Sequence, residues 1–328
     1  MTSNKKRLLV FVSDLGAAQI ITSLYHLLSA KFEICLLLSK TGCAKPIKNF
    51  IYVETKEEVL AHLTQFSPDL ILLGTSNSNL IEPIIISTAK TLKIKTISFV
   101  DQWHNYLQRF QSQARLILPD KVLLPDQNAL IEFSQLVSKK VELIACGQPY
   151  LAQFRKLSRQ TKRSKNLKVL LISEPISTSL NKEQKNALYG FDEKHLLKST
   201  IKVLNLLKVN YKLTVKLHPK EIKFKNKHEK RAQFINKAIT FQQLASYDII
   251  IGMHSTMLIT AYLIGLKVII FHPNGINHFD HCMLSRFNYL KRITTNFALL
   301  KALKRRKRGQ HRLALQDFKP IDFVNHIK

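Results

Sequence analysis

The chain has 328 residues, 45% of them hydrophobic, which suffices for two domains that each bury a core and argues against a largely disordered chain. No uninterrupted apolar run of about 18 residues is present, so the sequence predicts no transmembrane helix. The 51 Lys and Arg residues outnumber the 22 Asp and Glu residues, and the net charge of +29 favours anionic partners.

The basic residues are spread along the chain, with denser runs at 155–165 and 301–312. No zinc-finger, RRM or KH signature accompanies them, so specific nucleic-acid binding is not favoured. We expect a cytoplasmic protein that is attracted to the anionic inner face of the plasma membrane. The alternative is that the lysines only solvate helix faces. The four cysteines show no CxxC spacing, which indicates reduced thiols.

Strand-like and helix-like segments alternate through the first half. The opening apolar run ends at Ser13 and Asp14 without a cleavage site, so it predicts a first strand rather than a signal peptide. Strands are expected at 7–13, 32–39, 68–76, 95–101, 120–126 and 141–149, and helices at 17–30, 56–66 and 80–92, the last interrupted near Pro83.

A second alternating series follows a polar, basic segment. Strands are expected at 167–175, 211–219, 248–255 and 267–273, with helices at 193–208 and 256–266. Continuous apolar strands between amphipathic helices predict parallel sheets covered on both faces, hence an α/β fold with two Rossmann-like, doubly wound domains facing a cleft. The expected parts are a first domain at 1–152, a basic linker at 153–166, a second domain at 167–300 and a basic tail at 301–328.

Two strands of the second domain end in residues that suit a phosphate. His218 and Pro219 end the strand of "KLHP", and an imidazole there can donate to a phosphate oxygen or merely face water. In "GMHST" (252–256), Gly252 permits close backbone approach, and Ser255 and Thr256 stand where a helix begins. Their hydroxyls and the free N–H groups of a first turn form an anion site, although ordinary helix capping explains the same residues.

These motifs carry a resemblance. The stretch 167–275, with "KLHP" and "ASYDIIIGMHSTMLITAYLIGLKVIIF", resembles the carboxyl-terminal half of GT-B glycosyltransferases of the bacterial sialyltransferase and CDP-glycerol glycerophosphotransferase types. It is also similar to UDP-N-acetylglucosamine 2-epimerases, which share the fold. The resemblance implies that His218 and Pro219, with Ser255 and Thr256, hold the phosphate of a nucleotide-activated donor. It makes the second domain the donor domain and the first the acceptor domain.

Sialyltransferases usually carry an acidic motif in the first domain that supplies the general base, and no such string is present here. Asp14, beside Gly16, and Asp101 are the alternatives, because each follows a strand and a base must reach the acceptor hydroxyl. Of these two we prefer Asp14. Further residues are expected to contact substrate, or else to pack and cap: Trp103, Asn105 and Tyr106 for a sugar, Glu174 for donor base or ribose, and His254 beside the Ser-Thr pair.

The segment 271–282 gathers His272, His278, Asp280, His281 and Cys282 without a metal-site spacing, so we expect a loop and no metal. No cofactor is expected, since a CMP- or UDP-linked sugar would be a substrate. The leading hypothesis is a metal-independent glycosyltransferase that moves a sugar, with a nonulosonic acid as one candidate, to a cell-surface glycan or lipid-linked acceptor. The alternatives are a sugar-nucleotide 2-epimerase, which would need clustered carboxylates and His in the first domain, and a non-enzymatic protein that binds membrane or nucleic acid.

Overall fold

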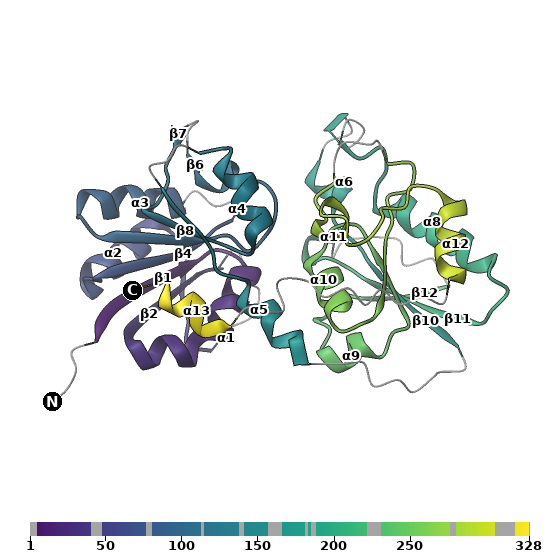
Figure 1. The fold of residues 1–328 in the computed structure, drawn as a ribbon, viewed down its shortest axis with the longest axis horizontal. Coiled ribbons are helices and arrows are strands. Elements are labelled where there is room, and N and C mark those ends of the chain that lie inside the picture. Colours follow the sequence, from purple (N-terminus) through teal and green to yellow (C-terminus); the bar gives the residue numbers. More distant parts are fainter. Residues whose placement is uncertain are drawn as a thin grey trace. The chain divides into compact units, whose positions relative to one another are not determined.

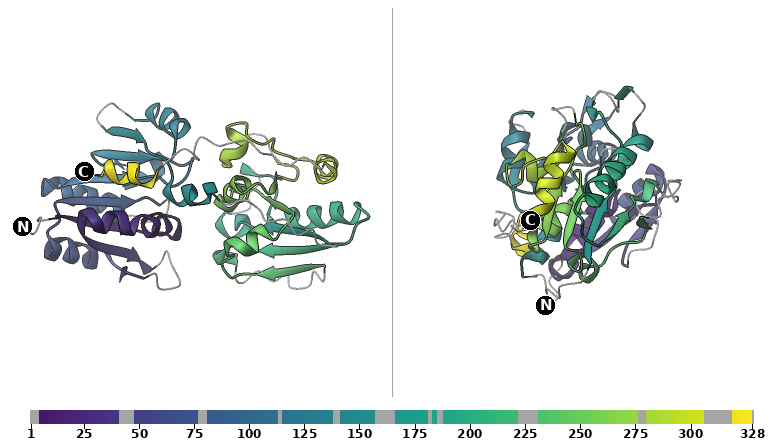
Figure 2. Two further views of the ribbon diagram at one scale, coloured as in Figure 1. Left: turned by 60° about the horizontal axis from the view of Figure 1, so that its bottom comes forward. Right: turned by 90° about the vertical axis from the view of Figure 1, so that its right-hand side faces the viewer.

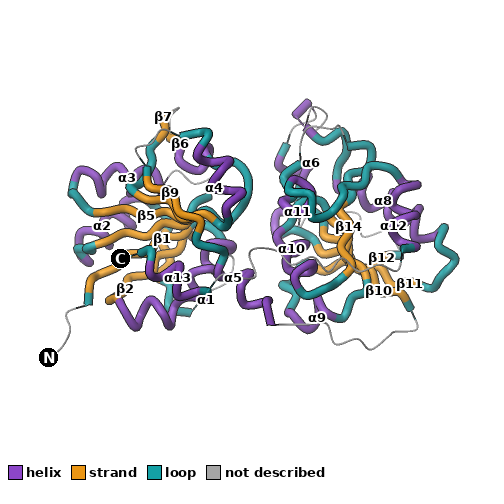
Figure 3. The backbone as a smooth tube through the Cα atoms, in the orientation of Figure 1, coloured by secondary structure: helices purple, strands orange, loops and turns teal. Residues whose placement is uncertain are grey.

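The chain folds into two compact units, each built on a parallel sheet. The computed structural model of the protein describes residues 5–40, 48–76, 81–112, 115–137, 141–156, 166–180, 183–184, 188–221, 231–275, 280–305 and 319–327. Unit 1 comprises Met1–Gln153 and Ala314–Lys328, and unit 2 comprises Phe154–Leu313. In both units the strands lie between layers of helices (Figure 1, Figure 3).

Within the described residues, unit 1 holds a seven-stranded sheet of order β3-β2-β1-β4-β5-β8-β9, in which every neighbouring pair is parallel. The strands are β1 (Lys6–Val12), β2 (Phe32–Ser39), β3 (Ile51–Val53), β4 (Leu70–Gly74), β5 (Lys95–Phe99), β8 (Lys121–Leu124) and β9 (Glu142–Ala145). A short antiparallel pair, β6 (Gln111–Ser112) and β7 (Arg115–Leu116), stands apart from this sheet. The chain order reverses between β1 and β4, where doubly wound sheets bind ligands.

Helices cover both faces of the unit 1 sheet because its strands are apolar on both sides. They are α1 (Leu15–Lys31), α2 (Lys56–Phe66), α3 (Ile81–Thr91), α4 (Gln127–Ser134), α5 (Pro149–Ala152) and α13 (Pro320–Asn325), with 3₁₀ turns η2 (Leu107–Phe110) and η3 (Gln153–Lys156). Helices α1, α5 and α13 contact one another, and α2 contacts α3. The expected interruption at Pro83 does not occur, because Pro83 lies in the first turn of α3, where a missing N–H costs no helical bond.

The chain returns to unit 1 at its last helix. Phe323, Val324 and Ile327 are at most 2% exposed and belong to the core formed by β1 and α1. The Phe323 ring meets Phe99 edge-on at 5.8 Å between centroids, and Lys121 Nζ donates to the His326 carbonyl at 3.2 Å. Residues 319–327 of the expected tail at 301–328 are therefore part of unit 1, because their apolar side chains complete its core.

In the part of unit 2 that the structure describes, a five-stranded parallel sheet has the order β12-β11-β10-β13-β14. Its strands are β10 (Leu167–Ile172), β11 (Tyr211–Lys216), β12 (Ala232–Ile235), β13 (Ile249–Gly252) and β14 (Lys267–Ile270). The helical segments are α6 (Ile176–Ser179), α8 (Glu193–Asn205), η4 (Pro219–Glu221), α9 (Phe241–Ala245), α10 (Thr256–Leu263), α11 (Met283–Arg286) and α12 (Asn296–Lys304). The order reverses between β10 and β13.

The predicted α/β class with two doubly wound sheets is confirmed. Sequence analysis did not identify the short strands β3 and β12, which lie at sheet edges and bury little apolar surface. Residues 157–165 of the expected linker, and 306–312 of the second basic run, lie outside the described residues. No helix in the described ranges has the length and apolar character needed to cross a bilayer.

We expect Phe323→Ala to lower the free energy of unfolding of unit 1 by about 3–5 kcal/mol, because a fully buried aromatic ring leaves a cavity. The single Trp of the chain, Trp103, lies in unit 1 and is 1% exposed, so its fluorescence during urea unfolding reports on that unit alone. Leu92→Ala is the control, because Leu92 lies in unit 1, is 52% exposed, and its loss should change stability by less than about 0.5 kcal/mol. Equal effects of the two substitutions would show that α13 does not contribute to this core.

Candidate functional site

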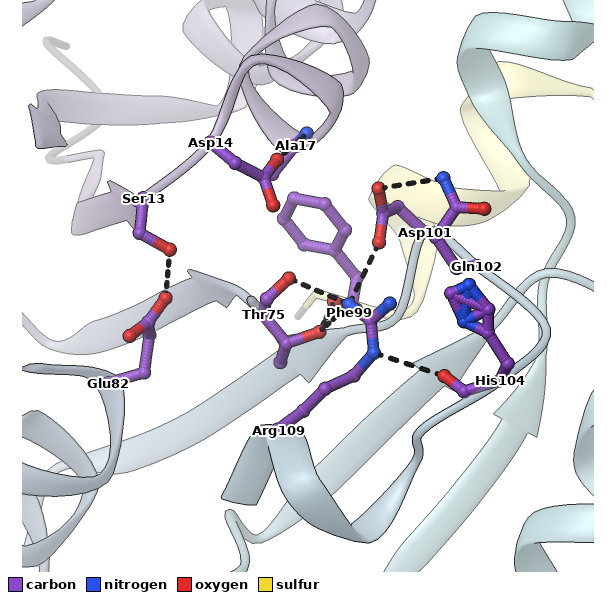
Figure 4. A network of polar contacts seen from close by, with 10 residues as sticks. All are labelled: Ser13, Asp14, Ala17, Thr75, Glu82, Phe99, Asp101, Gln102, His104 and Arg109. Atoms are coloured by element: carbon purple, nitrogen blue, oxygen red, sulfur yellow. Dashed lines mark hydrogen bonds and ion pairs between the residues drawn. The ribbon is translucent and has the colours of Figure 1, made fainter. Parts of the chain in front are cut away.

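A cluster of polar side chains lies at the carboxyl ends of β1, β4 and β5 in unit 1 (Figure 4). Asp14 follows β1, Thr75 follows β4 and Asp101 follows β5. These strands are neighbours, and the β1–β4 boundary is where the strand order reverses. The position is the one at which open α/β sheets bind their ligands.

A buried arginine holds this edge together. Arg109, on η2, is 3% exposed, and its guanidinium donates to Asp101 Oδ1 at 3.0 Å and to the Thr75 carbonyl at 2.9 Å. Its Nε also donates to the His104 carbonyl at 3.4 Å. One planar, permanently charged group thus fixes the loops that follow β4 and β5 and neutralises the Asp101 carboxylate.

Asp14 and Asp101 approach the same point beside Gly16. Asp14 caps α1 and accepts the N–H of Ala17 at 2.8 Å. A Cβ atom on Gly16 would lie 2.8 Å from Asp101 Oδ2 and 3.4 Å from Asp14 Oδ1. Gly16 therefore leaves room for two carboxylates at the first turn of α1. This explains the glycine without the substrate contact that was expected of it.

The pKa of Asp14 is raised above its ordinary value. Burial, with the nearby Asp101 charge, raises the pKa of Asp14 to about 6, against smaller opposing effects of its backbone hydrogen bonds and Arg109. Asp101 is held by its ion pair with Arg109. A carboxyl group whose pKa lies near neutrality, beside a fixed ion pair, is suited to taking up a proton from a substrate hydroxyl.

Glu82 is a further buried carboxyl group that the sequence analysis missed. It lies in the first turn of α3, is 1% exposed and accepts a hydrogen bond from the Ser13 hydroxyl (Figure 4). Burial raises its pKa to about 8, so it is uncharged at neutral pH. An acidic residue within the apolar segment "LIEPIIIS" was the available signal. Arg109 gave no comparable signal, because its partners come from distant segments.

Trp103 and Tyr106 pack into unit 1 and offer no ring face to a sugar. Trp103 is 1% exposed and donates from Nε1 to Asp126 at 2.8 Å. Tyr106 donates to Glu132 at 2.9 Å, and its ring stacks on Phe133 with centroids 5.4 Å apart. Asn105 adopts a left-handed conformation with φ of 55°, which asparagine tolerates better than most residues. These contacts match the packing interpretation of this segment.

In unit 2, the Glu174 carboxylate lies under the turn between β13 and α10. Its Oε1 accepts the N–H groups of His254 and Ser255 at 2.9 and 3.0 Å, and its Oε2 lies 2.5 Å from His254 Nε2. Burial alone would disfavour both charges, but their attraction lowers the pKa of Glu174 and raises that of His254. Glu174 and His254 therefore form a buried ion pair that fixes the turn.

This arrangement borders the expected phosphate site. Glu174 satisfies the N–H groups of His254 and Ser255, which precede α10, whereas the expected anion donors are the N–H groups of the first turn. Ser255 caps α10, its Oγ accepting the N–H of Met257 at 3.3 Å, and Thr256 is the first helical residue. A Cβ on Gly252 would lie 3.1 Å from Leu258, so the absence of a side chain there serves packing.

His218 stands at the end of β11 with a defined tautomer. Its backbone N–H donates to Glu221 Oε2 at 2.8 Å, and Ser173 donates to the other Glu221 oxygen at 2.7 Å. The ring Nδ1 accepts the N–H of Lys220 at 3.2 Å, so Nε2 carries the ring proton. Burial is the largest influence on His218 and lowers its pKa, which leaves a neutral N–H donor. Pro219 opens the short η4 turn that positions this loop.

Two histidines that follow β14, the buried His272 and the half-buried His281, lie near the Glu174–His254 pair. Burial lowers the pKa of His272 and of His281 to about 4, so both are neutral. Asp280 accepts from Ser285 at 2.6 Å and lies 3.7 Å from Arg292. His278 lies outside the described residues, and among those described no group of His, Cys, Asp and Glu is arranged to hold a metal ion.

No protein-family model and no curated protein sequence matches this chain. Solved structures are similar in fold. The UDP-N-acetylglucosamine 2-epimerase of Rickettsia bellii matches with a TM-score of 0.60 at 12% identity, over 93% of this chain and 91% of the other. The glycotransferase of kitacinnamycin matches with a TM-score of 0.58 at 11% identity, over 92% and 90%.

The wall teichoic acid polymerase TagF, as its H444N variant, matches with a TM-score of 0.52 at 12% identity, over 91% of this chain and 79% of that chain. Similarity at such low identity shows the fold and nothing finer. The chain therefore has the GT-B fold that these glycosyltransferases and epimerases share.

Glu82 should make the stability of unit 1 fall as pH rises. Below its ordinary value of 4.5 both folded and unfolded chains hold the proton; above it only the folded chain does, up to a pKa of about 8. Glu82→Gln, which imitates the neutral acid, should flatten this dependence, which is on the order of 3 kcal/mol between pH 5 and 8. Urea unfolding followed by Trp103 fluorescence tests this, with the exposed Glu57→Gln as control. A parent and a Glu82→Gln protein with the same pH dependence would contradict a protonated Glu82.

Proposed function

We propose that this protein is a sugar-nucleotide enzyme, and specifically a glycosyltransferase that moves a sugar from a CMP- or UDP-linked donor to a cell-surface glycan or lipid-linked acceptor. A nonulosonic acid is the sugar that the motif resemblance favours. The observation that carries the proposal is that each unit, taken by itself, holds a fitting group at the carboxyl edge of its own sheet. Unit 1 has a proton acceptor, Asp14, and unit 2 has a neutral N–H donor, His218.

Solved structures with this fold support a sugar-nucleotide ligand. The epimerase of Neisseria meningitidis, with a TM-score of 0.58, is bound to UDP-GlcNAc. The spinosyn rhamnosyltransferase SpnG, with a TM-score of 0.54, is complexed with thymidine diphosphate. The nucleotide base of this chain's donor is to be identified by the binding measurements described below.

In the proposed reaction, the acceptor hydroxyl attacks the anomeric carbon of the donor sugar. The bond from that carbon to the phosphate oxygen breaks, the nucleotide leaves with the electron pair, and Asp14 takes the hydroxyl proton. Asp101 lies beside Asp14 and is ion-paired with Arg109. His218 Nε2–H, with the hydroxyls of Ser255 and Thr256, stabilises the charge that develops on the leaving phosphate. Glu174 and Glu221 position the two loops that carry these groups.

A 2-epimerase is the second candidate, and one observation favours it. An epimerase must remove a proton from carbon and return one, so it needs several acid–base groups in one place. Sequence analysis found no clustered carboxylates in the first domain, but the structure gathers Asp14, Glu82 and Asp101 there. Incubation with UDP-GlcNAc in deuterated water separates the candidates: deuterium at carbon 2 of the sugar would indicate the epimerase and argue against transfer.

The first test is nucleotide binding. We expect the parent protein to be stabilised against heat by one of CMP, CDP, UDP and GDP, and His218→Ala to lose about 10- to 150-fold in donor affinity or turnover, as for a hydrogen bond to a charged group. His26→Ala, which removes an exposed histidine of unit 1, is the matched control and should have no effect. Unchanged binding and turnover in His218→Ala would place the phosphate site elsewhere. Lack of any nucleotide binding would favour the non-enzymatic alternative.

The second test concerns the base. Turnover should rise with pH through about 6, because Asp14 acts in its charged form and its pKa is raised to about 6. Asp14→Asn should lower turnover by about 100-fold or more without weakening nucleotide binding. Asp101→Asn should move the acid limb to lower pH, because the charge that helps to raise the Asp14 pKa is removed. A pH–rate profile of kcat/KM measures this shift, with Glu57→Gln as control. An acid limb that stays in place in Asp101→Asn would exclude Asp14 as the titrating group.

A further inference from the structure

Helix α8 presents a row of lysines to solvent. Lys194, Lys198 and Lys202 are exposed and four residues apart, so they lie on one face of the helix. The single acidic residue within α8, Glu193, is 1% exposed and accepts hydrogen bonds from Ser177. The opposite face, which includes Leu196 and Leu204, is buried in the core of unit 2. The solvent side of α8 is therefore uniformly cationic.

Helix α12 combines lysines with an exposed aromatic ring. Phe297 is 77% exposed, the largest exposure among the large apolar side chains described. Lys301 and Lys304 follow it at spacings of four and three and are also exposed, while Leu299 and Leu303 point into the core. The helix has no acidic residue.

The exposed sides of these helices form one surface. Helices α8 and α12 pack against each other and contribute to the same core, and they lie side by side in the views of the molecule (Figure 1, Figure 2). Both run toward the amino ends of the strands: α8 leads into β11, and the last carbonyls of α12 accept from Lys267, the first residue of β14. At that end Leu206 and Val209 are exposed beside Lys208.

We propose that this surface, the α8–α12 face, docks unit 2 on an anionic lipid bilayer. The face comprises Lys194, Lys198, Lys202, Leu206, Lys208, Val209, Phe297, Lys301, Lys304 and Arg305. Its lysines match the negative headgroups, and Phe297, Leu206 and Val209 enter the boundary between headgroups and acyl chains. The proposal does not depend on the proposed function.

The exposed apolar side chains distinguish a membrane from a nucleic acid. Phosphate backbones are bound by Lys and Arg, and exposed leucine or valine side chains add nothing to the affinity for phosphate. Exposed rings do bind bases, but the face also carries Leu206 and Val209, at the other end of the helices from Phe297, and these have no ring to stack. Lysine side chains can bury their methylene stems along lipid while the charge stays in water. Thirteen residues make α8 about 20 Å long, enough to contact several headgroups at once.

The test uses the full chain and vesicles of phosphatidylcholine with and without phosphatidylglycerol. We expect cosedimentation with the anionic vesicles only, weakening as salt rises. Lys198→Gln, Lys202→Gln and Lys301→Gln together should lower the partition coefficient on the order of 100-fold, from about fivefold for each lysine near an anionic surface. Lys56→Gln, Lys90→Gln and Lys95→Gln on unit 1 remove the same charge from exposed positions and should have little effect. Equal losses in the two triple variants would overturn the proposal, since net charge alone would explain them.

Phe297→Ser should weaken vesicle binding roughly tenfold, and the ratio to the parent should not change with salt because the contribution is apolar. Leu92→Ser, at a position 52% exposed on unit 1, is the matched control. A ring that enters lipid also predicts blue-shifted fluorescence of Phe297→Trp on anionic vesicles but not on neutral ones. Unshifted fluorescence, or binding of single-stranded RNA that competes fully with vesicles and depends equally on Phe297, would overturn the assignment to a bilayer.

Discussion

The buried pair of Arg109 and Asp101 is the interaction on which the unit 1 site depends. Removing either partner would leave an unpaired charge in a low-dielectric interior, which typically costs about 3–5 kcal/mol. The pair gives the loops after β4 and β5 one arrangement and places a fixed negative charge beside Asp14. Burial is the largest cause of the raised Asp14 pKa and the Asp101 charge adds to it, so the buried pair influences both the geometry and the protonation of the site.

The two units use a carboxylate at the same topological position for different purposes. In each, an acidic residue follows the strand at which the order reverses, Asp14 after β1 and Glu174 after β10. Glu174 is saturated by two N–H groups and the His254 ring, so it holds structure and has little freedom to exchange protons. Asp14 accepts its cap hydrogen bond through Oδ1, and its raised pKa leaves it responsive near neutral pH. A common framework thus provides one rigid and one titratable carboxylate.

Sequence patterns predicted what depends on neighbours along the chain. Apolar periodicity located the sheets, and the ends of strands identified Asp14, Asp101, Glu174 and His218. The partners could not be predicted, because they come from elsewhere: Arg109 reaches Thr75 across 34 positions, and Glu174 reaches His254 across 80. For the same reason the sequence could not show that Trp103, which was expected to contact a sugar, is buried and donates a hydrogen bond to Asp126. Helix capping and anion binding at Ser255 are predicted by the same residues. The sequence does not show that Glu174 accepts the N–H groups of His254 and Ser255.

The return of α13 to unit 1 makes that unit discontinuous in the chain, with all of unit 2 inserted before its last helix. During synthesis the ribosome releases β1, α1 and the other strands of unit 1 long before Phe323 and Ile327 emerge. Unit 2 is contiguous, so it can complete its core first. The apolar surface of α1 that α13 later covers stays open during this interval, which makes it a natural substrate for chaperones acting on the nascent chain.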